Sequence, residues 1–87
     1  MKAEIMGIGT ELLMGELTDI NSSWIASRLP ALGIELQWVS IIGDDLPRLT
    51  EAFKRGMERS DIIFTTGGLG PTQDDLTREA IAAAFGE

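Results

Sequence analysis

Apolar and polar residues along this 87-residue chain follow the pattern of alternating strands and helices. Residues 3–9 form a short apolar run that ends in glycine and predicts a first strand. Residues 34–42 predict a second strand, and the polar Glu35 and Gln37 near its start favour an edge or partly covered position. The third, residues 61–66, has three consecutive apolar residues, as in a strand that is buried on both faces.

Helical patterns separate and follow these strands. Residues 10–19 are less regular and predict a loop with a helical turn. In the first helix, Asn21 or Ser22 is a suitable cap, and Pro30 predicts a kink or an end near Arg28. Beyond it, Gly33 is placed for a left-handed helix stop, and the two tryptophans are expected in the core.

The second and third helices have clearer signals. Asp45 is a suitable cap for the second helix, with Pro47 in its first turn. An apolar stripe follows at helical spacing, made of Leu46, Leu49, Phe53 and Met57. The third helix is predicted over residues 72–85, with capping-box spacing between Thr72 and Asp75 and with Gly86 at its end.

The order βαβαβα predicts an α/β domain with a parallel sheet. Only half of a typical doubly wound domain is present, so residues 1–87 are expected to be a partial domain truncated at the C-terminus. In such sheets, ligands bind outside the carboxyl ends of the strands. Those ends are expected at residues 7–10, 42–45 and 65–70.

Composition narrows the chemistry. There is no cysteine and no histidine, which removes thiolate sites, disulfides and histidine bases. The net charge of −7 and the lack of a basic cluster argue against nucleic-acid binding. No apolar run approaches the roughly 20 residues that span a membrane, and the start of the chain reads as a strand and not a leader, so a cytoplasmic location is expected.

The glycine turn after the third strand is the first candidate site. Thr66 and the amides of Gly67, Gly68 and Gly70 precede a helix N-terminus, which is a natural place for phosphate. A purely structural turn remains the alternative. The spacing matches neither the Walker A motif nor the dinucleotide fingerprint.

Carboxylates near the strand ends are the second candidate. Asp75 is expected to bind a divalent cation or a substrate hydroxyl beside the phosphate, or simply to cap the helix with Asp74. Asp44 can face the same cleft, whereas Asp45 is better explained as a cap. Further candidates are Thr10 and Glu11, the latter as a metal ligand, base or solvated loop residue, together with Asn21 and Ser22.

Three strings, "GIGTELLMGELTDINSSWIASRL", "IIGDD" and "TTGGLGPTQDDLTREA", together resemble the amino-terminal domain of the CinA family, within the molybdopterin-binding MoaB/MogA-like superfamily. The resemblance runs over nearly the whole chain and implies a three-layer α/β/α fold. It implies that the glycines meet the phosphate of a pterin or nucleotide. It also places the family's catalytic acids on Asp75 and Asp44, with Thr77 nearby.

The resemblance further implies hydrolysis of ADP-ribose to AMP and ribose 5-phosphate with magnesium, manganese or cobalt. An alternative is a module that binds molybdopterin or a nucleotide without hydrolysis. A third is an inert fragment of a larger assembly that contributes only a subunit surface. The expected partner is a second copy or a missing C-terminal half, because the family domain is about twice as long.

Overall fold

The computed structural model describes residues 1–15, 19–67 and 71–86, with only the backbone described for residues 71–75. The elements follow the predicted order: the helical turn predicted within residues 10–19 is the short helix α1, and a 3-10 helix follows α2. Their bounds are β1 Lys2–Ile8, α1 Thr10–Leu13, α2 Ile20–Arg28, η1 Pro30–Leu32, β2 Glu35–Ile42, α3 Leu46–Arg59, β3 Ile62–Gly67 and α4 Pro71–Ala84.

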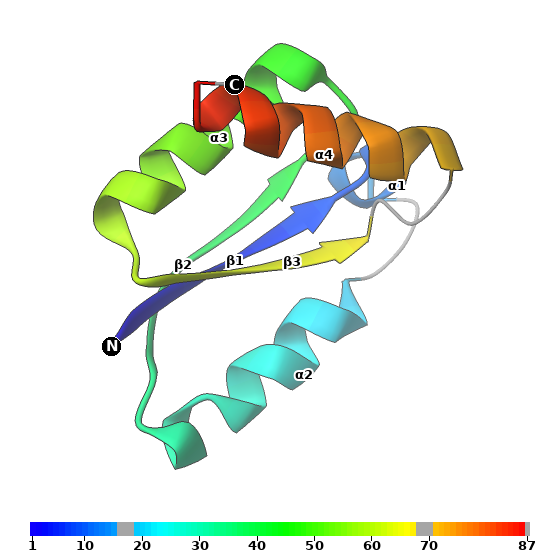
Figure 1. The fold of residues 1–87 in the computed structure, drawn as a ribbon. Coiled ribbons are helices and arrows are strands. Elements are labelled where there is room, and N and C mark those ends of the chain that lie inside the picture. The colour runs from blue at the N-terminus through cyan, green and yellow to red at the C-terminus, as the bar shows by residue number, and fades with distance from the viewer. Residues whose placement is uncertain (16–18, 68–70, 87) are drawn as a thin grey trace.

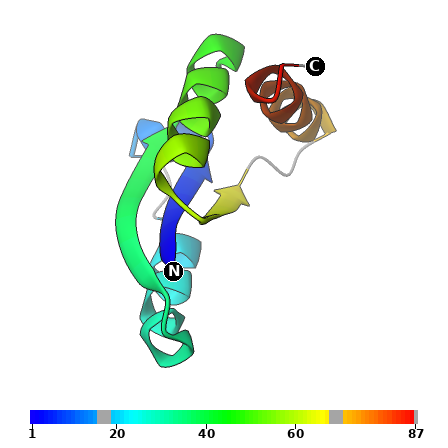
Figure 2. The ribbon, with the colours of Figure 1, turned by 60° about the vertical axis from the view of Figure 1, so that its left-hand side comes forward.

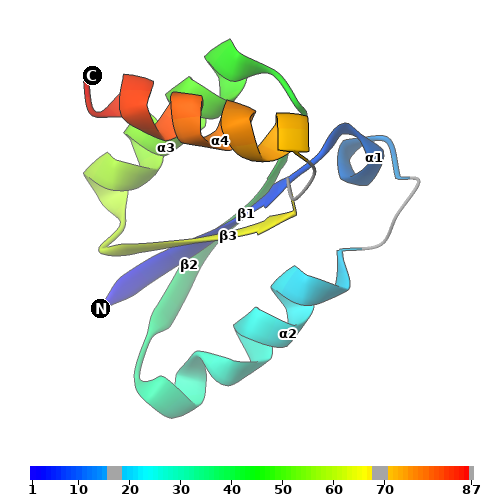
Figure 3. The ribbon, with the colours of Figure 1, turned by 45° about the vertical axis from the view of Figure 1, so that its right-hand side comes forward.

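The three strands form one parallel sheet in the order β2-β1-β3. The central strand, β1, is buried along almost its full length. In Figures 1 and 3, α3 and α4 cover one face of the sheet and α2 lies on the other. The predicted three-layer α/β/α arrangement with a parallel sheet is therefore confirmed, as a partial domain.

The main core lies between the sheet and the two helices α3 and α4, which Figure 2 shows next to each other. Its buried members are Met6, Ile8, Leu49, Phe53 and Ala80. The close approach of α3 to the sheet depends on a glycine, because a Cβ at Gly56 would lie 2.8 Å from Ile63 Cδ1 and 2.9 Å from Met6 Cε. Three residues of the predicted apolar stripe of α3, Leu46, Leu49 and Phe53, belong to this core, whereas Met57 is exposed.

A charged residue also lies beneath α3. Glu4 on β1 is fully buried, and its carboxylate accepts hydrogen bonds from Arg59 Nε at 2.9 Å and from Ser60 Oγ at 2.6 Å. Burial, the largest influence, raises the pKa of Glu4, but the hydrogen bonds from Arg59 and Ser60 and the charge of Arg59 outweigh it and lower the pKa overall. Arg59 also lies over the Trp38 ring, 4.1 Å from its centroid.

The cap of α2 differs from the prediction. Asp19, and neither Asn21 nor Ser22, is the N-cap, and its side chain accepts a hydrogen bond from the Ser22 amide. The predicted end near Arg28 is confirmed, since α2 stops there and Pro30 begins η1. Gly33 closes η1 with a left-handed φ of 72°.

Two predictions about burial are wrong. Trp24 and Trp38 are 61% and 49% exposed. Arg28 lies over the Trp24 ring, and Arg59 lies over the Trp38 ring. The apolar residues of β3 are half-buried, because β3 and β2 are the outer strands of the sheet within the described residues. The prediction of an edge position for β2 is correct.

Candidate functional site

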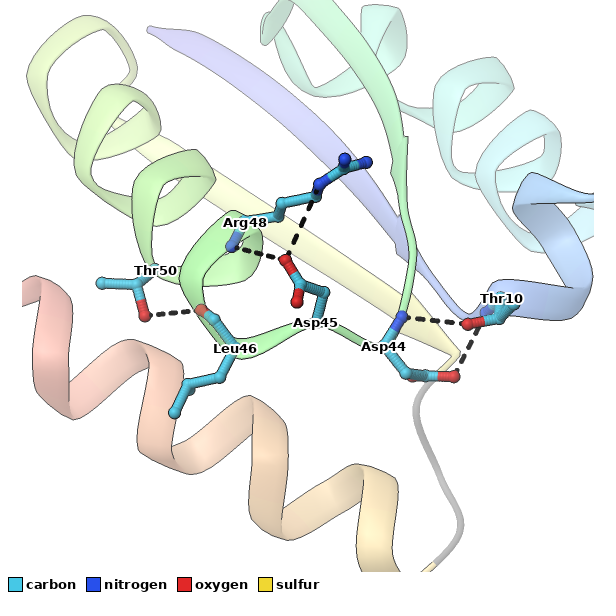
Figure 4. Close-up of polar contacts among 6 residues, drawn as sticks. All are labelled: Thr10, Asp44, Asp45, Leu46, Arg48 and Thr50. Carbon is cyan, nitrogen blue, oxygen red and sulfur yellow. Dashed lines mark hydrogen bonds and ion pairs between the residues drawn. The ribbon is translucent and has the colours of Figure 1, made fainter.

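The carboxyl ends of β1 and β2 are joined by a reciprocal pair of hydrogen bonds (Figure 4). The Thr10 amide donates to Asp44 Oδ2 at 3.2 Å, and the Asp44 amide donates to Thr10 Oγ1 at 3.1 Å. The Gly9 amide also donates to the Ile42 carbonyl at 2.9 Å. The structure therefore holds the Asp44 carboxylate at the edge of the sheet where ligands bind in open parallel sheets.

The neighbouring acid, Asp45, has a structural role in α3. Asp45 caps α3, and its carboxylate accepts a hydrogen bond from the Arg48 amide at 3.2 Å (Figure 4). The Arg48 guanidinium lies 3.7 Å from the same carboxylate. The sequence-based interpretation of Asp45 as a cap is confirmed.

A second polar cluster lies where α2 begins and β3 ends. Ser22 Oγ donates to Asp19 Oδ2, while the Ser22 amide donates to Asp19 Oδ1 at 3.0 Å. The hydroxyls of Ser22 and Thr66 lie 3.4 Å apart. Both residues are buried, so these contacts tie the N-terminus of α2 to the end of β3.

Sequence reasoning did not single out Asp19. The available signal was an aspartate directly before an apolar residue, with a serine three positions later, which is N-cap spacing. Asp19 also fills the space beside Gly7, since a Cβ at Gly7 would lie 2.7 Å from Asp19 Oδ2. Gly7 thus lets the Asp19 carboxylate lie directly against β1.

The last residue of β3, Gly67, lies where no residue with a side chain fits. Gly67 has a left-handed φ of 78°, and a Cβ there would collide with the backbone carbonyl of Ile8. The chain then passes to α4, which starts at Pro71. The predicted phosphate contacts of Gly68 and Gly70 lie outside the described residues. The same holds for the side chain of Asp75, whose backbone lies in the first turns of α4.

The remaining candidates are dispersed. Glu11 lies in α1 and folds back over Gly9, with Oε1 2.6 Å from the position of a Cβ there. Asn21 is exposed on α2, and Thr77 is half-buried on α4. Among the described residues, no three acidic side chains gather into a metal-binding group. No helix in that part of the chain is long and apolar enough to cross a membrane.

Comparisons with known proteins agree on one family. The family model described as "Probable molybdopterin binding domain" matches residues 4–87. A competence-damage inducible protein of Alkaliphilus oremlandii is 53% identical over 87 residues. A CinA-like protein of Thermomicrobium roseum is 52% identical over the same length. Each match covers 100% of this chain and 21% of the relative, so the chain spans about a fifth of their length.

Two solved structures have the same fold. The CinA protein of Thermoplasma acidophilum matches with a TM-score of 0.91 and 33% identity, over 100% of this chain and 53% of that chain. The molybdopterin biosynthesis enzyme MoaB of Thermus thermophilus matches with a TM-score of 0.78 and 24% identity, over 90% of this chain and 53% of that chain, which concerns the fold alone. The chain belongs to the molybdopterin-binding domain family, and it is similar to proteins of the CinA type.

Proposed function

We propose that the domain binds a nucleotide diphosphate such as ADP-ribose at the carboxyl ends of its strands, and that the whole protein hydrolyses the pyrophosphate. The observation that carries this proposal is the reciprocal pair of Thr10 and Asp44, which holds a carboxylate at the ends of two strands. The β3–α4 turn opens at the same edge, since parallel strands end together. The Asp44 carboxylate and the end of β3, which leads into the proposed phosphate-binding turn, therefore share one edge of the sheet.

The phosphate part of the proposal rests on the backbone. Gly67 turns the chain out of β3, and α4 begins four residues later. A helix N-terminus carries about half a positive charge and amides without helical partners, so it suits phosphate oxygens. In this proposal the amides of Gly67, Gly68 and Gly70 hold the phosphates.

The cation part rests on Asp44 and on Asp75. Magnesium is commonly bound by one or two carboxylates with phosphate oxygens and water, so a large acidic cluster is not required. The positioned carboxylate of Asp44 at the strand ends fits one ligand of such a cation. In this proposal Asp75, whose backbone lies in the first turns of α4, is the second ligand. Such a cation supplies charge neutralisation of the pyrophosphate and a more acidic bound water.

The role of the chain itself is to orient and hold. The Thr10 amide donates to the Asp44 carboxylate and limits its rotation, while the Thr10 hydroxyl accepts from the Asp44 backbone amide and holds the backbone in place. Asp45 is engaged with the first turn of α3 and is left out of the chemistry. One of the two adjacent acids is therefore assigned to the site and the other to the helix.

The test is AMP release from ADP-ribose by the whole protein with magnesium, manganese or cobalt. Asp44→Asn and Asp75→Asn are expected to reduce kcat by at least a hundredfold, within the range attributed to acid–base and electrostatic groups. Glu58→Gln is the matched control, because Glu58 is an exposed carboxylate on α3 away from the strand ends. Unchanged AMP release in both aspartate variants would contradict the proposal.

A non-hydrolytic binding module is the second candidate. The family description and the fold shared with MoaB favour a pterin as its ligand. Calorimetry with molybdopterin, ADP-ribose and AMP separates the two candidates. Binding of molybdopterin without hydrolysis of ADP-ribose would favour the module.

We further propose that the outer edge of β3 is covered, either by another part of a longer protein or by a second copy. Grooves of about 420 Å³ and 640 Å³ flank this strand on its two faces, and the exposed Phe85 and Trp24 line them. Light scattering on the 87-residue chain tests self-association.

A cytoplasmic location is also proposed, and cell fractionation tests it.

A further inference from the structure

The hydroxyls of Ser22 and Thr66 form a short chain of hydrogen bonds that ends on Asp19. A carboxylate only accepts, and Ser22 uses its single hydroxyl proton to donate to Asp19 Oδ2. In its 3.4 Å contact with Thr66, the Ser22 oxygen can therefore only accept. A hydrogen bond across this contact therefore runs from Thr66 to Ser22, and the next one runs from Ser22 to Asp19.

This direction limits what Thr66 can offer to a ligand. When Thr66 gives its only hydroxyl proton to Ser22, the lone pairs of Thr66 Oγ1 are what remains for any other contact. An unprotonated phosphate oxygen only accepts hydrogen bonds, so it cannot bond to these lone pairs. A sugar hydroxyl or an amino group is a donor and matches them.

The surroundings keep this direction fixed. Ser22 and Thr66 are 6% and 8% exposed, so bulk water supplies few alternative partners. Asp19 is held by the Ser22 amide and by its close approach to Gly7. Thr66 directly precedes Gly67, where the chain enters the glycine turn.

We propose that Asp19 is a positioning residue that sets the direction of this chain, and that Thr66 thereby recognises a hydroxyl or amino donor of the ligand. Phosphate is left to the backbone amides of the glycine turn. The location of the ligand rests on the proposed function, whereas the direction of the hydrogen bonds does not. In this proposal Thr66 does not bind phosphate, in contrast to the glycine amides with which it was first grouped.

Asp19→Asn is the informative substitution because it preserves shape and changes donors. If the amide oxygen keeps the bond from the Ser22 amide, the new NH₂ group meets Ser22 Oγ and donates to it. The Ser22 proton must then turn to Thr66. The chain is reversed, and Thr66 becomes a donor toward the ligand.

The first experiment needs no ligand and compares melting temperatures. In the reversed chain, Thr66→Val leaves a buried Ser22 proton without an acceptor, which costs more than leaving a lone pair unused. Thr66→Val should therefore lower Tm by about 4 °C more in the Asp19→Asn variant than in the wild-type protein. The difference should disappear when Ser22 is replaced by alanine.

Thr50→Val is the control for this cycle. The Thr50 hydroxyl donates to the Leu46 carbonyl at 2.8 Å within α3, away from Asp19. Its effect should be the same in the wild-type protein and in the Asp19→Asn variant. Additive effects of Thr66→Val and Asp19→Asn, like those of the control, would overturn the proposed direction.

The second experiment measures Kd for inorganic phosphate and for ribose 5-phosphate. Thr66→Val should weaken ribose 5-phosphate about threefold to tenfold, the loss of one hydrogen bond, and should leave phosphate unchanged. Asp19→Asn should also weaken the binding of ribose 5-phosphate and leave that of phosphate unchanged. Thr66→Ser keeps the hydroxyl, so it should bind ribose 5-phosphate as the wild-type protein does. Equal losses for both ligands would overturn the recognition by Thr66.

If the wild-type protein binds neither ligand, the recognition by Thr66 fails, whereas the proposed function is decided separately by AMP release from ADP-ribose. The melting temperatures still decide the direction of the hydrogen bonds in that case. If phosphate binds but ribose 5-phosphate gains nothing from Thr66, only the recognition fails.

Discussion

Arg59 and Glu4 form a two-point ion pair that fixes the end of α3 on the central strand. Arg59 Nε donates to Glu4 Oε2 at 2.9 Å, and Arg59 Nη2 donates to Oε1 at 3.1 Å. Glu4 is fully buried, while the Arg59 side chain is 32% exposed. The pair therefore satisfies a carboxylate that could not otherwise remain charged inside the domain.

Glu4→Gln is expected to lower the free energy of unfolding by about 2–3 kcal/mol, because Arg59 loses its counter-charge and Ser60 a charged acceptor. Urea denaturation measures the change. Glu51→Gln is the control, since it removes an exposed pair with Arg55 at 3.0 Å and should cost less than about 1 kcal/mol. Equal losses in the two variants would show that burial of the pair is unimportant.

The same pair predicts an acid-dependent loss of stability. The pKa of Glu4 in the folded domain is lowered below its ordinary value of 4.5. The stabilisation is therefore fully present above pH 4.5 and is lost as the pH falls through the lower, folded-state pKa. Denaturation curves between about pH 2 and 6 should show this contribution in the wild-type protein and lack it in Glu4→Gln.

Gly56→Ala is expected to destabilise the domain by about 1–3 kcal/mol, although alanine is the better helix former. The added Cβ would lie 2.8 Å from Ile63 Cδ1 and 3.1 Å from Glu4 Oε1. Thermal unfolding measures the loss. Lys54→Ala, at an exposed position of the same helix, should change Tm little. A rise in Tm for Gly56→Ala would mean that α3 moves away from the sheet without loss.

Asp45→Ala and Asp44→Ala should separate a cap from a site residue. Asp45→Ala removes the acceptor for the Arg48 amide and should cost about 1 kcal/mol of stability with little change in affinity for ADP-ribose. Asp44→Ala should reduce the affinity for ADP-ribose in the presence of magnesium. Calorimetry and thermal unfolding on both variants provide the test, and the opposite pattern would reverse the two assignments.

Much of the fold was predictable because it follows from local chemistry. The glycine at position 33, the proline at position 30 and the cap at Asp45 each act within a few residues of themselves. The burial of Glu4 was not predictable, because its partners, Arg59 and Ser60, are 55 and 56 residues away. The exposure of Trp24 and Trp38 was likewise not predictable, because it depends on how the chain packs around α2 and the outer strand β2.

The candidate site divides in the same way. The order of strands and helices predicted that residues 7–10 and 42–45 would lie at one edge of the sheet, and the structure joins Thr10 to Asp44 there. The hydroxyl chain was not predictable, because it joins Ser22 to Thr66 across 44 residues. The roles of Asp75, Gly68 and Gly70 stay predictions.

Gly67 has a consequence for protein engineering. Its left-handed backbone lies so close to the Ile8 carbonyl that no side chain fits between them. Position 67 must therefore stay glycine in any redesigned version of this domain that keeps the end of β1 in place. Diversified libraries of the strand ends should leave it fixed and vary Thr66 or Thr10 instead.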